Sequence, residues 1–348
     1  MSKSRVLQLL VSVAIGAGCL WLAFRDVPLD EAKTAIARVP WWVHGVYVLS
    51  LFAQFVLRSL RWSIQVQGQA GRAPSLKDSL AINAVSFAAV FLIPFRLGEL
   101  VRPYLGAQRG LMRKSTGLAH SAVERILDGL VTTAFFALVL VLLGEHKLPD
   151  EVRYAGWLGL LIFGGASVVL ALAFWSREAS ERFWRKLIGL LHKGLADKLV
   201  GMLGAFLDGV ACFRSLGAFF GYVALTVVYW LMNGAAMWVV LWGMGTGAGP
   251  LVAYFALCFL VISVMLPAPP GNVGNFHAFA KWALTLLGVA EGPALAYAII
   301  LHAWQVATLL VWAGVFVLRG DVSLAKVREA TSGEEDPGLA DGAVAVEP

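Results

Sequence analysis

The sequence predicts an all-α protein that crosses a membrane several times, and three observations support this fold class. Of its 348 residues, 59% are hydrophobic and only 14% are charged, whereas a soluble domain carries about 25% charged residues. The mean hydropathy is +0.75, and the apolar residues gather in runs close to the ~20 residues that a membrane helix requires. The 13 tryptophans lie largely at the ends of these runs, as in the aromatic belts of membrane interfaces.

Six of the apolar runs are predicted to cross the membrane completely. The first follows Lys3 and Arg5 and is too long for the core of a cleaved signal peptide. We therefore expect it to be retained, with its N-terminus in the cytoplasm. The expected spans are Val6–Phe24, about Trp41–Leu57, Ile126–Leu143, Tyr154–Trp175, Leu216–Trp242 and Pro293–Leu318.

Two further apolar segments are interrupted by proline. The first enters at Leu80, reaches Pro94 and then meets charged residues, and the second contains the sequence PAPPGNVGN at Pro267–Asn275. Proline removes a backbone donor and clashes with the preceding helical turn, so neither segment is expected to be one continuous helix. We predict two re-entrant helical hairpins, at about residues 80–110 and 251–288, that enter from opposite sides of the membrane. A pair of broken segments in opposite orientation indicates a binding site near the midplane.

The distribution of basic residues supports this topology. With a re-entrant first hairpin, 22 of the 28 lysines and arginines fall on one side of the membrane. A full crossing at Leu80–Phe95 would move the basic residues from Arg96 to Arg125 to the other side. The side rich in basic residues is the cytoplasmic one. We therefore expect both termini, and also residues 70 and 110, to face the cytoplasm, with the protein in the inner (plasma) membrane.

Residues 1–320 are predicted to form one membrane domain. Within it, the basic stretch 176–214 is either an amphipathic helix on the inner membrane surface or a helix packed on the protein. Residues 321–348 form a short acidic tail that we expect to be disordered. The three cysteines are isolated, so no disulfide framework or metal site is predicted. The net charge of +6 reflects basic cytoplasmic loops, and no nucleic-acid partner is expected.

Charged residues interrupt the apolar pattern of the first broken segment. An ionisable residue at the centre of a membrane helix costs roughly 2.5–3.5 kcal/mol, so those that persist pair, line water or bind a ligand. Arg96, Glu99 and Arg102 are three residues apart and are predicted to form one ridge, in which Arg96 pairs with Glu99. The alternative places them in a loop and at helix ends, level with the lipid headgroups. The candidate binding residues of this region are Arg58, Arg61, Asn83, Arg96, Glu99, Arg102, Glu124, Arg125 and Asp128.

The second broken segment provides another candidate group. A helix that starts near Asn275 would point its positive N-terminal end into the protein, which favours an anion such as phosphate. The alternative is a structural turn between two packed half-helices. The candidates here are Gly271, Asn272, Gly274, Asn275 and His277.

No established catalytic motif stands out in the chain. It contains no Gly-x-Ser-x-Gly, no His-Glu-x-x-His, no phosphate-binding loop and no Cys/His cluster. We therefore assign no catalytic residue, expect no cofactor and do not predict an enzyme. An intramembrane enzyme that uses Glu99, Glu124 or Asp128 in acid–base chemistry stays open.

Four motifs resemble the flippase-like family that includes the transmembrane region of bacterial lysylphosphatidylglycerol synthases, the multiple peptide resistance factors. They are Arg58-Ser-Leu-Arg61-Trp62, Pro94-Phe-Arg96-Leu-Gly98-Glu99 with Arg102, Glu124-Arg125-Ile-Leu-Asp128, and Pro267 to Gly274. The resemblance covers about residues 5–320. It departs at His277, where many members have a glutamate, and in lacking the soluble aminoacyl-transferase domain of the synthases.

The resemblance implies translocation of a lipid between leaflets. From the residues, we expect Arg96 and Arg102, together with Arg58 and Arg61, to bind the headgroup phosphate. Glu99, Glu124 and Asp128 are expected to pair with these arginines when no lipid is bound, or to meet a cationic headgroup. Two other functions stay open. One is an intramembrane enzyme that acts on a polyprenyl-phosphate or a lipid-linked sugar. The other is a scaffold that partners a separate lipid synthase. The protein is also a candidate homo-oligomer.

Overall fold

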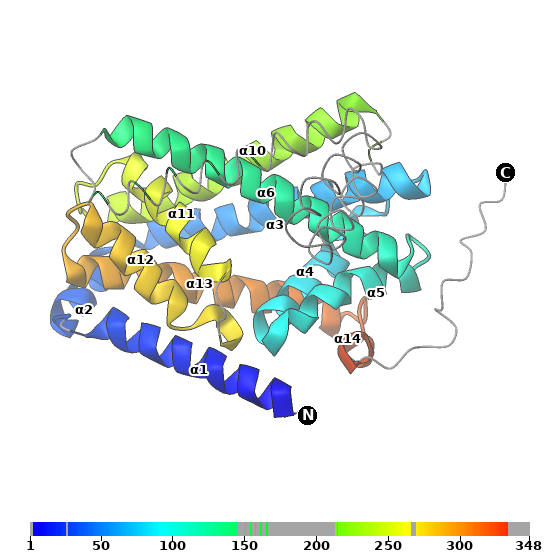
Figure 1. Ribbon diagram of the computed structural model, residues 1–348, viewed down its shortest axis with the longest axis horizontal. Helices are drawn as coiled ribbons and strands as arrows, with labels where there is room; N and C mark the ends of the chain where they lie inside the picture. Colours follow the sequence, from blue (N-terminus) through cyan, green and yellow to red (C-terminus); the bar gives the residue numbers. More distant parts are fainter. Residues whose placement is uncertain are drawn as a thin grey trace, which may run out of the picture.

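The computed structural model describes residues 3–25, 27–144, 215–265 and 269–332, together with isolated positions between 150 and 213. Every regular element in these ranges is a helix (Figure 1), which confirms the predicted all-α class. Within these ranges, four helices are long and apolar enough to cross a membrane. They are α3 (Trp41–Ala70), α6 (Lys114–Leu143), α10 (Leu216–Gly243) and α13 (Glu291–Leu318).

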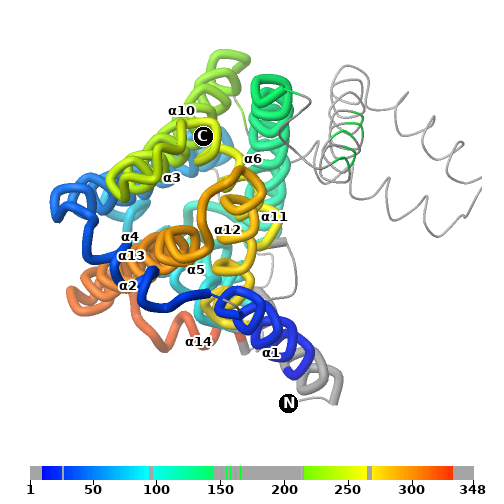
Figure 2. The backbone as a smooth tube through the Cα atoms, turned by 90° about the vertical axis from the view of Figure 1, so that its left-hand side faces the viewer, coloured from blue at the N-terminus to red at the C-terminus, as the bar shows by residue number. Residues whose placement is uncertain are grey.

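The N-terminal apolar run forms a bent pair of helices. Helix α1 (Lys3–Phe24) is followed by α2 (Leu29–Arg38), with a bend of 82° between them, and the two together are long and apolar enough for one further span. Figure 2 shows α1 at the edge of the bundle, while α2 packs on α13. The predicted span Tyr154–Trp175 and the basic stretch 176–214 lie outside the described residues, so the predicted count of six spans stays a prediction.

The first broken segment reverses direction at Pro94. Helix α4 (Leu76–Leu92) ends there, and a 3₁₀ helix, η1 (Pro94–Leu100), leads into α5 (Val101–Gln108). The η1 segment folds back onto α4 so closely that a Cβ atom on Gly98 would collide with the backbone of Ala89. Only glycine permits this approach, because every other residue carries a Cβ.

The second broken segment is built similarly. Helix α11 (Pro250–Met265) precedes a single 3₁₀ turn, η2 (Pro270–Asn272), and then α12 (Asn275–Leu286). Helices α11 and α12 pack against each other. Gly271 has φ +79° and Gly274 has φ +91°, backbone conformations that residues other than glycine rarely adopt.

The two breaks meet inside the protein. Helix α4 contacts η2, and the ring of Phe91 lies 3.5 Å from the position that a Cβ atom on Gly271 would take. Helix α1 crosses beside them, because the Cβ position of Gly274 is occupied by the carbonyl oxygen of Gly16, and that of Gly16 by the ring of Pro269. Close glycine contacts therefore hold α1 against the second break.

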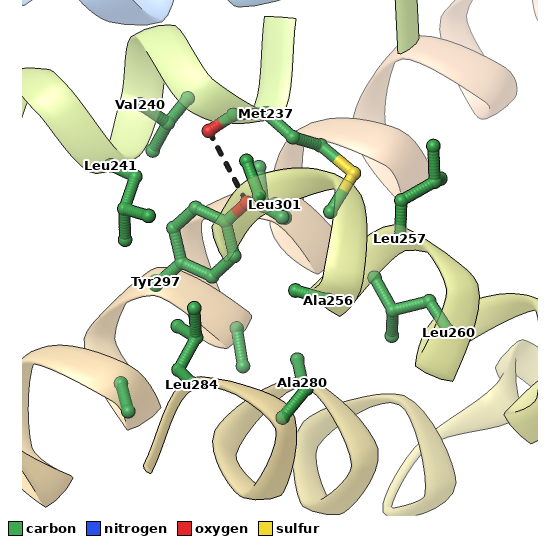
Figure 3. Packing of buried hydrophobic residues seen from close by; sticks show 14 of the residues in the cluster. Met237, Val240, Leu241, Ala256, Leu257, Leu260, Ala280, Leu284, Tyr297 and Leu301 are labelled. Carbon is green, nitrogen blue, oxygen red and sulfur yellow. Dashed lines mark hydrogen bonds between the residues drawn. The ribbon is translucent and has the colours of Figure 1, made fainter. Parts of the chain in front are cut away.

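Two large apolar cores hold these elements together. In the larger core, α10, α11, α12 and α13 surround Tyr297, whose hydroxyl donates to the backbone oxygen of Met237 at 3.2 Å (Figure 3). The smaller core centres on Trp62 and Ile82 and joins α3, α4, α5 and α13.

The C-terminal tail begins with a helix. Helix α14 (Leu324–Ser332) packs on α5, and the hydroxyl of Tyr104 donates to Glu329 at 2.9 Å. Val327 and Ala330, three residues apart, are buried on one face of α14 and so dock it on the protein. The expected disorder of the tail stays a prediction. Residues after 332 lie outside the described ranges.

The contact between α1 and the second break can be tested with two glycines of the same helix. Gly16→Ala should lower the free energy of unfolding by about 1–3 kcal/mol, because the new methyl group overpacks the contact with Pro269. Gly18→Ala has nothing within 4 Å of the new atom and should be neutral or stabilising by up to about 1 kcal/mol. Detergent-induced unfolding measures both, and equal stabilities would contradict the close contact.

Candidate functional site

A buried ion pair joins the middle of α3 to α6. The Nη2 atom of Arg61 lies 2.7 Å from Oδ1 of Asp128, and these residues are only 1% and 6% exposed. Two side chains of α10 complete the arrangement. Arg61 Nη2 also donates to the hydroxyl of Tyr222 at 3.1 Å, and Trp230 Nε1 donates to Asp128 Oδ1 at 3.1 Å. The ion pair and its hydrogen bonds thus connect three helices, α3, α6 and α10.

A second ion pair joins α5 to α6. Arg102 Nη1 lies 2.6 Å from Oε2 of Glu124 and 3.4 Å from the side-chain oxygen of Asn83, while Arg102 Nη2 donates to Ser121 Oγ at 3.0 Å. Asn83 in turn donates to the backbone oxygen of Ser79 at 2.8 Å. The guanidinium of Arg102 is therefore surrounded by protein acceptors from α4 and α6.

The pairing differs from the ridge that the sequence predicted. Arg102 pairs with Glu124 and not with Glu99, because the fold-back at Pro94 sets α5 against α6. Glu99 lies 3.6 Å from Arg125 in a half-exposed pair. The backbone of Arg96 belongs to η1, but its side chain lies outside the described part, so the predicted pair of Arg96 with Glu99 stays a prediction.

Arg58 is held by aromatic rings. Its guanidinium lies 4.2 Å from the ring centroid of Phe87 and 5.0 Å from that of Tyr229, an arrangement that attracts a cation electrostatically. Among the described side chains, no carboxylate lies within ion-pair distance of Arg58. Its Nε atom, and the Nε and Nη1 atoms of Arg61, are buried without a protein acceptor. The cluster thus holds arginine donors that its own carboxylates do not satisfy.

The candidates of the second break form a separate group. The rings of His277 and His302 are 4.8 Å apart, and His302 Nε2 lies 2.7 Å from the carbonyl oxygen of Gly271. This group lies beside Phe91 at the end of α4, whereas the cluster contacts Phe87 and Asn83, one and two turns earlier on the same helix. The two groups of candidates therefore lie along neighbouring stretches of α4.

Packing accounts for part of the second group. Gly274 lets α1 approach, and Gly271 offers its carbonyl oxygen to His302. The amide nitrogen of Asn272 lies 3.5 Å from Ser263 Oγ, and the backbone of Asn275 begins α12. Anion binding at the start of α12 stays a prediction.

Sequence reasoning missed the aromatic side chains that complete the cluster. Tyr222 and Tyr229 lie seven residues apart and so face the same way on α10, and Phe87 lies one turn after Asn83 on α4. Their signal was the helical spacing of aromatic residues near polar ones, but within apolar spans such residues also fit an ordinary core.

The comparisons with known proteins agree with a membrane-lipid protein. A family model described as "Lysylphosphatidylglycerol synthase TM region" matches residues 9–313. A protein named "Glycosyltransferase AglD" from Haloferax volcanii is 26% identical over 340 residues, which cover 88% of this chain and 52% of that protein. The chain therefore spans about half the length of that relative. No solved structure matches the chain.

The pair of Arg102 with Glu124 can be tested by a mutant cycle. Glu124→Gln should destabilise the protein by about 3–5 kcal/mol, because it leaves a buried guanidinium without its counter-charge. The double change Arg102→Gln with Glu124→Gln should recover more than half of that loss. Unfolding in detergent measures the three free energies.

The matched control is an exposed pair on α2. Lys33 lies 3.3 Å from Asp30, and both side chains are largely in solvent, so Asp30→Asn should leave the stability unchanged. Additive effects of the Arg102 and Glu124 substitutions would show that the two side chains are not coupled.

Proposed function

This chain belongs to the family described as the lysylphosphatidylglycerol synthase TM region, and on that premise we propose that it translocates a phosphate-bearing lipid between the leaflets of a membrane. The observation that carries the proposal is the buried cluster between α3, α5, α6 and α10, with arginine donors that have no protein acceptor. Buried charged residues in membrane helices are costly and typically mark a substrate path.

The proposed topology has six full spans and two opposed re-entrant hairpins. The protein lies in the inner membrane, with both termini in the cytoplasm. It is supported by the fold-back at Pro94, by the packing of α11 on α12 and by the contact between the two breaks. Irregular backbone at membrane depth is tolerated where protein or a polar cavity surrounds it. Broken helices that meet inside the protein are typical of transporter sites.

In the proposed mechanism, the headgroup crosses through the cluster while the acyl chains stay in the bilayer. Guanidinium groups bind phosphate through two parallel hydrogen bonds. Arg61 and Arg58 have the donors for this contact, whereas Arg102 already donates to Glu124 and Ser121. In the empty state, the carboxylates compensate the arginines and so keep the site folded.

A second candidate function follows from the relative that is named a glycosyltransferase. An intramembrane enzyme that acts on a lipid-linked sugar would use the same phosphate contacts. It differs from a flippase in leaving a covalently changed lipid, which mass spectrometry of the lipids after incubation would detect. A scaffold for a separate lipid synthase, or an assembly of several copies, would add partners without changing this site.

Transport can be separated from stability at Arg61 and Asp128. The double change Arg61→Gln with Asp128→Asn removes both charges of the pair, so most of the stability should remain. Transport should fall at least about tenfold, because the phosphate loses a charged donor. The assay follows a phosphatidylglycerol with a fluorescent acyl chain in vesicles that contain the protein, with quenching from outside. Substitution of the exposed Arg72 by Gln serves as the control. Full transport by the double variant would contradict the role of Arg61 in phosphate binding.

The topology can be tested with single cysteines in a chain whose three native cysteines are replaced by alanine. Cysteines at the exposed positions Gln69 and Arg113 flank the first hairpin and should both react with an impermeant maleimide from the cytoplasmic side. Reaction of the Arg113→Cys variant only from the outside would mean that residues 80–110 cross the membrane completely.

A further inference from the structure

The charged cluster has an excess of positive charge among its described side chains. Each carboxylate faces a guanidinium, at distances from 2.6 to 3.6 Å. The cation without a carboxylate partner is Arg58, and an uncompensated charge at a partly buried position is costly. A negative charge from a ligand would therefore be stabilised there. The four cations are Arg58, Arg61, Arg102 and Arg125, and the three anions are Glu99, Glu124 and Asp128.

The open donors point to the same place. Arg58 and Arg61 are three residues apart on α3 and so share a face. The Nε atom of each, and Nη1 of Arg61, are buried without a protein acceptor. Arg61 is 1% exposed, so this is a buried charged side chain with unused donors. A phosphate supplies several acceptor oxygens and fits two neighbouring guanidinium groups.

The groups that would recognise an amine are already occupied. A protein binds an ammonium through a carboxylate or through the face of an aromatic ring. The carboxylates are in ion pairs with arginines. The rings of Phe87 and Tyr229 lie against Arg58, and that of Tyr222 lies 4.8 Å from the guanidinium of Arg61. An ammonium would have to displace a guanidinium to reach Glu124, Asp128 or any of these rings. Glu99 is half-exposed, and its contact with Arg125 is longer, at 3.6 Å.

We propose that the cluster accepts a phosphate headgroup that carries no amine, and that it discriminates against headgroups bearing a lysyl or ethanolamine group. This inference rests on the proposed function, because it names the substrate class of the same site. Phosphatidylglycerol and a polyprenyl phosphate share the accepted chemistry. The family's name refers to a lipid with a lysyl group, so the inference sets this chain's substrate apart from that lipid.

Binding tests the inference without requiring transport. The purified full-length chain in detergent is titrated with phosphatidylglycerol, a polyprenyl phosphate, lysylphosphatidylglycerol and phosphatidylethanolamine, and native mass spectrometry measures the bound fraction. At least one of the two lipids without an amine should bind about tenfold or more tightly than both lipids with one. The tighter of the two identifies the kind of lipid that the site takes. Equal or tighter binding of the lysyl lipid would overturn the inference.

Variants of Arg58 test whether this residue makes the distinction. Arg58→Met removes the unpaired charge and should reduce the preference to within about threefold, whereas Arg58→Lys keeps the charge and should retain most of it. The exposed Arg72→Gln should bind like the unchanged protein. A full preference in a folded Arg58→Met variant would overturn the role of Arg58, and if that variant does not fold, the comparison of lipids on the unchanged protein still decides.

The vesicle assay separates this inference from the proposed function. Selective binding without any movement of lipid between leaflets would reject translocation and leave the selectivity standing. Movement of lysylphosphatidylglycerol as fast as phosphatidylglycerol would reject the selectivity and leave translocation standing.

Discussion

The cost of a buried charge without a counter-charge is the constraint on which the structure depends. Arg61 and Arg102 find their counter-charges on helices that are distant in sequence. The carboxylates of Asp128 and Glu124, one turn apart on α6, bind one arginine from α3 and one from the first hairpin. The position of α6 against α3 and α5 is therefore fixed by two charge pairs as well as by apolar packing.

The broken segments follow from the same requirement. A helix that stops inside the protein leaves backbone groups without partners, and here these groups are covered by protein. The carbonyl oxygen of Gly271 is bound by His302, and η1 lies directly on the backbone of α4 at Gly98. Glycine has no Cβ atom, so at these contacts it lets one backbone segment lie directly against another. The reversal at Pro94 also sets α5 against α6, which is how Arg102 reaches Glu124.

Much of this architecture could be predicted from the sequence, since long apolar runs and proline breaks determine where helices cross and where they stop. The limits of the helices could not. Charged residues were read as the ends of spans at Leu57 and Ile126, but α3 continues to Ala70 and α6 begins at Lys114. Arg61 on α3 and Glu124 on α6 are paired with side chains on other elements, which a local pattern does not reveal.

The partners within the site show the same limit. The charged residues of the cluster were identified from their cost in an apolar segment, and pairing of Glu124 and Asp128 with arginines was expected. Which arginine each carboxylate meets could not be predicted, because that depends on how distant helices pack. The aromatic neighbours Phe87 and Tyr229 were not identified, because an aromatic residue in an apolar span also fits an ordinary core.

The separation of Arg61 from its partners along the chain has a consequence for biogenesis. Asp128 lies 67 residues after Arg61 in the chain, and Tyr222 lies 161 residues after Arg61. At a synthesis rate of about 5–20 residues per second, the ribosome needs roughly 10–30 s after making Arg61 to make Tyr222. During that interval the nascent α3 carries an arginine for which at least one final acceptor does not yet exist. Until the later helices are inserted, the insertion machinery, lipid phosphates or water must solvate that charge. Helix α3 therefore reaches its final position in the membrane late.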